Sequence, residues 1–163
     1  MDAYEKVRTD TVLRAMLSRA VEGIQATEGS LLLVSPDGQG LRFVLAHSPV
    51  EDRLVGNVEP LNKGISGLAF SLQQPMVVND TDSDPSFDPT VDRRTGVKTK
   101  SILVVPLVSP TDEFGVLTAI NSRREGGFIH QDLKTYGEAA RDITEHLASL
   151  HLALSSQNDG PFD

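Results

Sequence analysis

The chain contains no cysteine among its 163 residues, and this absence excludes several kinds of site. Without thiols, the protein can form no disulfide, no zinc site with thiolate ligands and no iron–sulfur cluster held by cysteines. It can attach no chromophore through a thioether, and it offers no cysteine nucleophile. The functions that remain open therefore depend on other side chains.

A surplus of positive charge is also missing. The 15 lysine and arginine residues are outnumbered by 23 aspartate and glutamate residues, which gives a formal net charge of −8. Contacts to nucleic-acid phosphates need a basic face, and anionic membranes attract basic segments. Neither nucleic acid nor a membrane is therefore expected as a partner.

Long apolar runs are absent as well. No run approaches the ~18 residues that a membrane span needs, and the start MDAYEKVRTD is too polar for a signal peptide. We therefore expect a cytoplasmic protein. With 39% hydrophobic residues in the chain, residues 1–154 are expected to form one domain with a sizeable core. Residues 155–163 have the composition of a linker.

The apolar pattern predicts an α+β domain. The expected elements are, in order, a helix at 4–27, strands at 30–35 and 41–48, a short helix at 68–73, strands at 76–79, 101–108 and 116–122, and a long helix from residue 133. Gly29 is expected to end the first helix, and Gly64 and Gly67 to frame a turn before the short one. Pro106 suggests a bulge or an edge position in its strand. This order predicts a central antiparallel sheet of five or six strands.

A polar insert at residues 80–100 separates two apolar strands. A loop of that length inside a compact domain is uncommon, and it is usually either functional or disordered. Here Pro85, Phe87 and Pro89 punctuate the insert, and both of its flanks are strongly apolar. We expect it to cap one face of the sheet, with room for a small molecule beneath it.

The last helix carries apolar residues at intervals that alternate between three and four. They are Leu133, Tyr136, Ala140, Ile143, Leu147, Leu150 and Leu154. A helix that packs within its own chain needs only a broad apolar stripe, whereas this spacing is a heptad seam. The seam predicts pairing with another helix. That helix is either the N-terminal one or the same helix of a second subunit in a homodimer.

Several segments in this order resemble the GAF domain family, the sensory modules of signalling proteins. They are KGISGLAF at 63–70, VVND at 77–80, DPSFDP at 84–89, TKSILVVPL at 99–107 and GVLTAIN at 115–121. The resemblance covers roughly residues 12–150. It implies a PAS-like central antiparallel sheet with the N- and C-terminal helices packed on one face. A ligand pocket is implied on the other face, under the segment that follows the strand at 76–79.

Family members bind cyclic nucleotides, bilins, haem, iron or small metabolites, so the family does not settle the function. The nucleotide-binding branch carries an Asn-Lys pair, a Phe and an Asp-Glu pair. This chain has Asn121, Phe128 and Asp132 in that order, but Ser122 replaces the lysine and Leu133 replaces the glutamate. Because a Lys–Asp ion pair holds the pocket lid in that branch, these departures argue against a cyclic nucleotide.

Enzyme and metal functions are not expected. The methionine sulfoxide reductase branch of the family uses cysteines, which this chain lacks. The four histidines show no ligand spacing for haem or iron. Asp80, Asp82 and Asp84 resemble the start of a calcium loop, but Pro85 and Val91 stand where its glycine and closing glutamate belong. Turns and helix caps are the expected role of these aspartates.

Four cations, Arg93, Arg94, Lys98 and Lys100, stand close together in the insert of this acidic protein. They could clamp an anionic ligand, because arginine forms a fork that matches carboxylate or phosphate. They could equally be solvated and paired with the neighbouring aspartates.

The function expected from the sequence is a non-catalytic sensory or regulatory domain. It would bind an unidentified small molecule beneath the insert and signal through the terminal helices of a homodimer. The residues expected to line the pocket are Phe70, Asp80, Phe87, Arg94, Thr99, Ser101 and Leu103. The alternative is a dimerisation or scaffold module without a ligand, in which Phe87 and Leu68 fill the space completely.

Overall fold

The computed structural model describes residues 1–152. The elements are α1 Ala3–Arg8, α2 Thr11–Gly23, β1 Ala26–Val34, β2 Gly40–His47, α3 Glu51–Leu54, β3 Val58–Pro60, α4 Gly64–Leu72, β4 Met76–Val78, the 3-10 helix η1 Thr81–Ser83, α5 Thr90–Thr95, β5 Ile102–Val108, β6 Glu113–Ser122 and α6 His130–Ser149. The predicted tail at 155–163 lies outside the described residues. Within residues 1–152, no helix combines the length and apolar composition that crossing a membrane requires.

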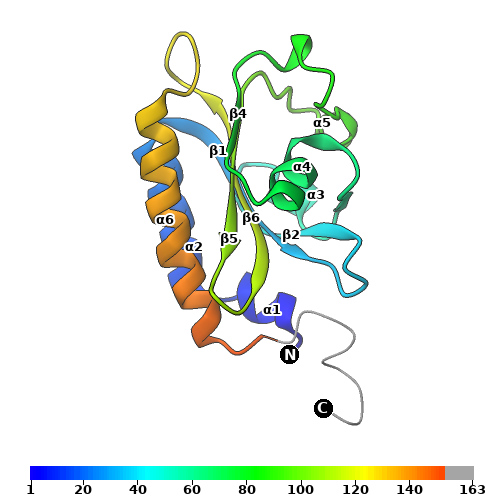
Figure 1. Cartoon of the computed structure of the whole chain (residues 1–163), viewed down its shortest axis with the longest axis vertical. Helices are drawn as coiled ribbons and strands as arrows, with labels where there is room; N and C mark the ends of the chain where they lie inside the picture. The colour runs from blue at the N-terminus through cyan, green and yellow to red at the C-terminus, as the bar shows by residue number, and fades with distance from the viewer. Residues whose placement is uncertain (153–163) are drawn as a thin grey trace.

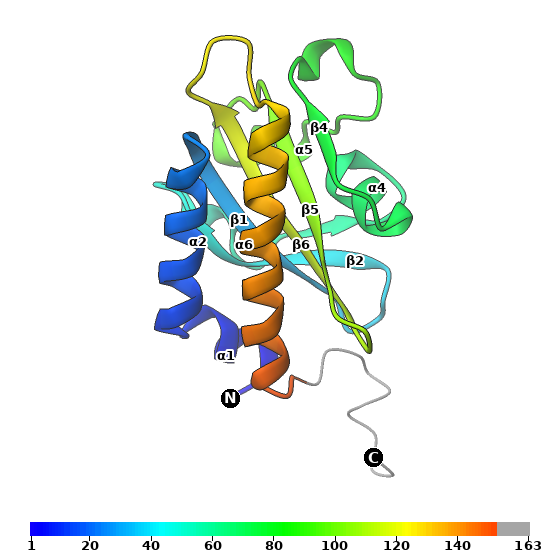
Figure 2. The same ribbon diagram turned by 60° about the vertical axis from the view of Figure 1, so that its left-hand side comes forward.

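One antiparallel sheet of six strands, in the order β3-β2-β1-β6-β5-β4, forms the centre of the domain. The helices α2 and α6 lie side by side on one face of the sheet, and α3, α4 and α5 lie on the other (Figures 1 and 2). The α+β architecture predicted from the sequence is therefore confirmed, with six strands. Pro106 lies where β5 has run past β4, which pairs only with Ile102–Val104, so its missing N–H costs no ladder hydrogen bond there.

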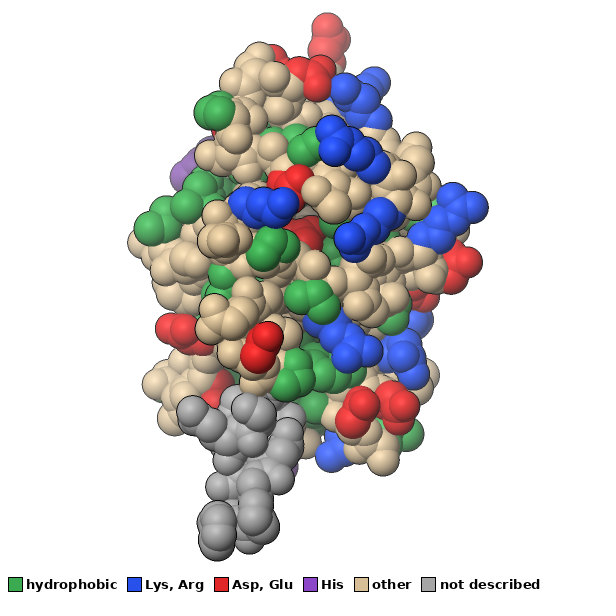
Figure 3. All heavy atoms as spheres, turned by 90° about the vertical axis from the view of Figure 1, so that its right-hand side faces the viewer, with side chains coloured by type: hydrophobic (Ala, Val, Ile, Leu, Met, Phe, Trp, Pro, Cys, Tyr) green, Lys and Arg blue, Asp and Glu red, His purple; other side chains and the backbone are tan. Residues whose placement is uncertain are grey.

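The sheet is apolar on both faces. Along β5, Leu103, Val105 and Leu107 belong to the core under the terminal helices, whereas Ile102 and Val104 belong to a second core under α4 and the insert. This division follows the alternation of side chains along a strand. The side of the molecule that carries α3, α4 and α5 presents both acidic and basic side chains (Figure 3).

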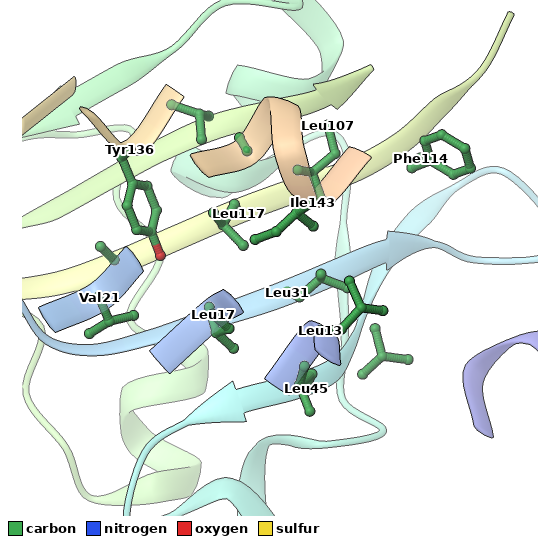
Figure 4. Close-up of a cluster of buried hydrophobic side chains, with 14 of the residues drawn as sticks. Leu13, Leu17, Val21, Leu31, Leu45, Leu107, Phe114, Leu117, Tyr136 and Ile143 are labelled. Carbon is green, nitrogen blue, oxygen red and sulfur yellow. The ribbon is translucent and has the colours of Figure 1, made fainter. Parts of the chain in front are cut away.

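The core on the helical face joins α2 and α6 to the sheet. Leu13, Leu17 and Val21 of α2 meet Tyr136 and Ile143 of α6 over the strands (Figure 4). The seam residues considered for a subunit interface take part in this core. Four seam residues are buried in the chain's own core, and two are partly buried against it: Tyr136, Ala140, Ile143 and Leu147, and then Leu133 and Leu150.

The seam therefore packs against α2 and the sheet of the same chain, the first of the two partners considered for it. Leu154 lies outside the described residues. Dimerisation stays a prediction.

The N-terminal region also differs from the prediction. Instead of one helix over 4–27 there are two, because the Asp10 side chain accepts a hydrogen bond from Leu13 N (2.9 Å) and caps the start of α2. Gly29 does not end a helix but lies within β1. A Cβ at this position would come within 2.4 Å of Val21 and 2.9 Å of the Tyr136 hydroxyl, so glycine lets both helices lie close to the strand.

Gly67 has a comparable packing role in α4. A Cβ there would lie 2.7 Å from the Leu61 carbonyl oxygen and 2.9 Å from that of Pro60. Gly137, in the interior of α6, has no atom within 4 Å of its would-be Cβ. In a helix interior, alanine is more stabilising than glycine by about 0.8–1 kcal/mol. The packing around the would-be Cβ therefore decides whether the substitution stabilises or destabilises the domain.

We predict that Gly137→Ala raises the free energy of unfolding by about 0.5–1 kcal/mol. Gly67→Ala should lower it by about 1–3 kcal/mol, because α4 must move away from the loop. Urea denaturation followed by circular dichroism measures both. A stabilised Gly67→Ala variant would contradict the close packing of α4.

Candidate ligand-binding site

A cavity lies between the sheet and the insert. Its outer chamber, about 190 Å³, is bounded by β3, the start of α4 and the insert. Its inner chamber, about 70 Å³, lies against the strands β1, β2 and β6 and the region of α5. The residues that line both chambers are Glu59, Ser66, Phe87, Asp88, Val91 and Ile102.

The insert is folded by its own side chains. The Asp84 carboxylate accepts from Ser86 N (2.8 Å), which forms an Asx turn. The Asp92 carboxylate accepts from the backbone N–H of Thr99 (2.8 Å) and from its hydroxyl (2.7 Å). The predicted turn-forming role is confirmed for Asp84, whereas Asp82 pairs with Lys98 at the surface. The bonds of Asp84 and Asp92 help to fold the insert. Within residues 1–152, no group of three or more histidine, aspartate or glutamate side chains is arranged to hold a metal ion.

The ends of the insert are tied to the rest of the domain by two asparagines. The Asn121 side chain accepts from Lys100 N (2.7 Å) and donates to the Lys98 carbonyl oxygen (2.9 Å). Asn79 accepts from Phe128 N (2.8 Å) and donates to its carbonyl oxygen (2.9 Å). Both joints connect the insert to segments that lead into α6.

The carboxylate of Asp132 has a cationic partner in this chain. Although residue 122 is a serine, the Asp132 carboxylate pairs with Arg124, two residues further along, and also accepts from Ile129 N. Asp132 is buried and lies in the first turn of α6. The position at 122 therefore does not decide whether this carboxylate has a cationic partner.

Glu59 has the most perturbed carboxylate of the cavity. Burial raises the pKa of Glu59 from 4.5 to about 7, the nearby carboxylates of Asp88 and Asp92 add to the rise, and the Ser66 hydroxyl opposes it. In contrast, a hydrogen bond from the Thr90 hydroxyl (2.6 Å) lowers the pKa of Asp88. The two neighbouring carboxylates are thus held in different environments.

Two cations line the outer chamber. Lys63 Nζ lies 3.6 Å from Asp88 Oδ2, and its side chain is 60% exposed. Arg94 Nη1 donates to Asn57 Oδ1 (2.7 Å). Of the four cations considered as a clamp, only Arg94 lines a chamber, and Lys98 instead pairs with Asp82 (3.0 Å) at the surface. Basic side chains flank acidic ones on this side of the molecule (Figure 3).

Three of the seven residues predicted to line the pocket do so: Phe87, Arg94 and Thr99. The other four lie elsewhere. Phe70 is buried in the core beneath α4, and Leu103 faces the terminal helices. Asp80 is exposed and accepts from the Ser83 hydroxyl (2.7 Å), and buried Ser101 accepts from Ser122 N (3.0 Å).

The sequence interpretation missed Glu59, Ser66, Asp88 and Ile102. Alternation along β5 requires that Ile102 and Leu103 face opposite sides, but the run is apolar at both positions, so the facing side could not be read. Glu59 lies in a strand of three residues, too short to show any periodicity. No pattern in the sequence indicated that it faces the cavity.

A hydrogen bond connects the inner chamber to the opposite face of the sheet. Thr118 of β6 lines the inner chamber, and its carbonyl oxygen accepts from the Tyr136 hydroxyl of α6 (2.6 Å). Burial raises the pKa of Tyr136 well above its usual range, so the hydroxyl stays a donor. The strand that lines the cavity is therefore bonded directly to the last helix.

The raised pKa of Glu59 predicts how the stability of the domain depends on pH. Above pH 7, Glu59 is ionised in both the folded and the unfolded state, and its charge lowers the free energy of unfolding. Below pH 4.5, Glu59 is neutral in both states and has no such effect. The cost is roughly 2–3 kcal/mol at pH 8. We predict that Glu59→Gln is more stable than the wild type at pH 8 by up to that amount, and that the difference disappears toward pH 4.5.

Urea titrations at pH 5 and pH 8 measure this difference. Glu113→Gln, at an exposed position at the start of β6, is the matched control and should leave the pH dependence of stability unchanged. A stability difference for Glu59→Gln that is the same at both pH values would contradict the described environment of Glu59.

The sequence matches the GAF domain family over residues 7–148. It is 29% identical over 124 residues to the cone cGMP-specific 3',5'-cyclic phosphodiesterase subunit alpha' of Mus musculus. It is 26% identical over 138 residues to the probable 3',5'-cyclic phosphodiesterase pde-5 of Caenorhabditis elegans. These matches cover 74% and 79% of this chain, but only 13% and 19% of the two relatives, so the chain spans less than a fifth of either.

Solved structures show the same fold. The free methionine-R-sulfoxide reductase from Neisseria meningitidis, solved with its substrate, has a TM-score of 0.70 and 22% identity, covering 90% of this chain and 84% of that one. The GAF domain of a phosphoenolpyruvate-protein phosphotransferase from Coxiella burnetii has a TM-score of 0.72 and 16% identity, covering 90% and 89%. At such identities the likeness concerns the fold alone. The match over residues 7–148 includes most of the chain, and the protein therefore belongs to the GAF domain family.

Proposed function

We propose that this domain is a non-catalytic regulatory module that binds a small molecule in the cavity beneath the insert. The observation that carries the proposal is the unfilled space itself. In a scaffold module, Phe87 and Leu68 were expected to fill the space under the insert. Phe87 instead lines both chambers, and Leu68 lines neither. A concave site with apolar walls and a few polar groups is typical of ligand binding.

The proposal excludes a thiol-dependent reaction. The domain shares its fold with free methionine-R-sulfoxide reductases, a branch whose chemistry uses cysteines, and none of the 163 residues here is a cysteine. The carboxylates of the cavity are suited to binding a ligand by charge and hydrogen bonding. Placement of the protein in the cytoplasm stays a prediction from the sequence.

Cyclic nucleotides are the competing ligand class, because the two curated relatives are named as cyclic nucleotide phosphodiesterases. A cyclic nucleotide carries a phosphate, which would have to lie near Lys63 and Arg94 and away from Glu59, Asp88 and Asp92. Like charges repel strongly in a partly buried site. We therefore rank this class below ligands that can satisfy the carboxylates.

Transmission of the signal is proposed to run through the sheet to α6. A ligand beside Thr118 would act on the strand that accepts the hydrogen bond from Tyr136. It can shift the helix only if it binds two arrangements of the domain with different affinity. We propose that α6 reports the change to a partner, either a second subunit or a following domain.

A thermal-shift panel tests the proposal. It should contain cyclic mono- and dinucleotides, 2-oxo acids, amines and amino acids. A ligand at a hundred times its dissociation constant stabilises the folded state by about 2.7 kcal/mol. At roughly 2–4 °C per kcal/mol for a domain of this size, we expect one class to raise the melting temperature by about 5–10 °C.

A variant in which a larger side chain fills the cavity is the control. Val91 lines both chambers, and Val91→Trp should abolish the shift. Val12, which is 51% exposed on α2, supplies the matched variant Val12→Trp, which should keep it. A flat panel, or a shift that survives Val91→Trp, would contradict binding in this cavity and favour the scaffold function.

A further inference from the structure

The two chambers of the cavity differ in charge. Four carboxylate side chains line the inner chamber, those of Glu28, Glu59, Asp88 and Asp92, and no lysine or arginine of residues 1–152 lines it. The basic residues Lys63 and Arg94 line the outer chamber, and both are exposed. The outer chamber therefore has two carboxylates, Glu59 and Asp88, balanced by two cations, whereas the charged side chains of the inner chamber are carboxylates alone.

Three of the four carboxylates already have partners in the protein. Asp92 accepts two hydrogen bonds from Thr99, and Asp88 is bonded to Thr90 and paired with Lys63. Buried Glu28 accepts from the Ser48 hydroxyl. These three groups form the polar wall of the cavity, and the protein groups bonded to them partly compensate their charge.

Glu59 is different. It lies where the two chambers join, and the hydroxyl of Ser66 is its hydrogen-bond partner. Among residues 1–152, no lysine or arginine forms an ion pair with it. A largely desolvated carboxylate without a cation is costly to ionise, and although Glu59 keeps some exposure to solvent, desolvation raises its pKa to about 7. A positive group in the inner chamber would remove that cost.

We infer that the ligand is a small zwitterion of the amino-acid type, with its ammonium group beside Glu59 and its carboxylate at Lys63 and Arg94. This inference rests on the proposed function and names the ligand class for the same site. An ammonium group donates three hydrogen bonds, and arginine binds a carboxylate through two parallel N–H groups. The apolar part of the ligand would contact Ile65 and Val91, which line the outer chamber.

The size of the cavity agrees with this class. The outer chamber of about 190 Å³ is smaller than the roughly 300–1,000 Å³ of sites for drug-sized ligands. It suits a metabolite of amino-acid size better than a nucleotide or a linear tetrapyrrole. A purely anionic ligand would leave Glu59 uncompensated, and a simple amine would offer no carboxylate to Lys63 and Arg94.

Matched ligand pairs test the inference with the wild-type chain. Each of the twenty L-amino acids is titrated by calorimetry at pH 8, followed by the deaminated and decarboxylated analogues of the tightest binder. For valine these are isovalerate and isobutylamine. We expect an amino acid to bind, and each analogue to bind roughly tenfold more weakly or worse, because each loses one charged contact.

Two variants test separately the contacts proposed for the two charged ends of the ligand. Glu59→Gln should weaken the amino acid and the amine by roughly tenfold while leaving the carboxylic acid unchanged or tighter. Arg94→Gln should weaken the amino acid and the carboxylic acid but leave the amine unchanged. Lys100→Gln, which changes an exposed cation of the insert that lines neither chamber, is the control and should bind like the wild type. Circular dichroism confirms that each variant is folded.

The outcomes distinguish failure of this inference from failure of the proposed function. Equal binding of the amino acid and its deaminated analogue would overturn the role of Glu59, although the cavity would still be a ligand site. Binding of a cyclic nucleotide with no response to any amino acid would also overturn the inference and keep the proposed function. No binding by any compound would overturn both.

Discussion

The constraint on which the domain depends is a sheet that is apolar on both faces. Leu103 and Val105 of β5 need cover on one side, and Ile102 and Val104 need it on the other. The terminal helices supply the first cover by packing along the strands. The chain between β2 and β5 has to supply the second, because burial of apolar area is the main favourable term in folding.

The two layers that cover the faces of the sheet differ in how completely they fill the space above it. On the helical face, Tyr136, Ile143 and Leu147 are fully buried, and the core is continuous. On the other face, the insert contributes few apolar side chains, chiefly Phe87 and Val91, which are only partly buried. A polar segment stretched over an apolar sheet covers it without filling the space beneath. The cavity is thus a consequence of the composition of the insert, and its carboxylates come from the insert and from β1 and β3.

A few hydrogen bonds connect the cavity to the rest of the domain. Asn79 and Asn121 fix the two ends of the insert beside the segments that lead into α6. Tyr136 adds a hydrogen bond through the sheet to Thr118. A change in the insert could therefore reach α6 through the two segments that lead into the helix and, by way of the sheet, through Tyr136. These contacts give the regulatory proposal a physical route, although a route alone supplies no coupling energy.

Much of the fold could be predicted from the sequence, and much of the site could not. Apolar runs, turn residues and the ordered segments from Gly64 to Asn121 sufficed for the sheet, its helices and the family. The side that each residue of β5 faces could not be read, because ILVVPLV is apolar at nearly every position. This ambiguity placed Leu103 in the pocket instead of Ile102.

The seam of α6 left its partner undecided for a related reason. A helix that packs on its own sheet and on α2 shows the same three-and-four spacing as a coiled coil, so the pattern named the buried face without naming the partner. Glu59 and Arg124 had no local signal at all. Their roles arise from contacts that only the folded chain creates, with Ser66 and Asp132 respectively.

Amide hydrogen exchange of the insert, measured with and without a saturating compound from the binding panel, tests the central claim most directly. If a small molecule occupies the cavity, exchange should slow in residues 81–99 and around β3, because these segments form its walls. Saturation that leaves exchange in both segments unchanged, with protection confined to other surfaces, would contradict the account.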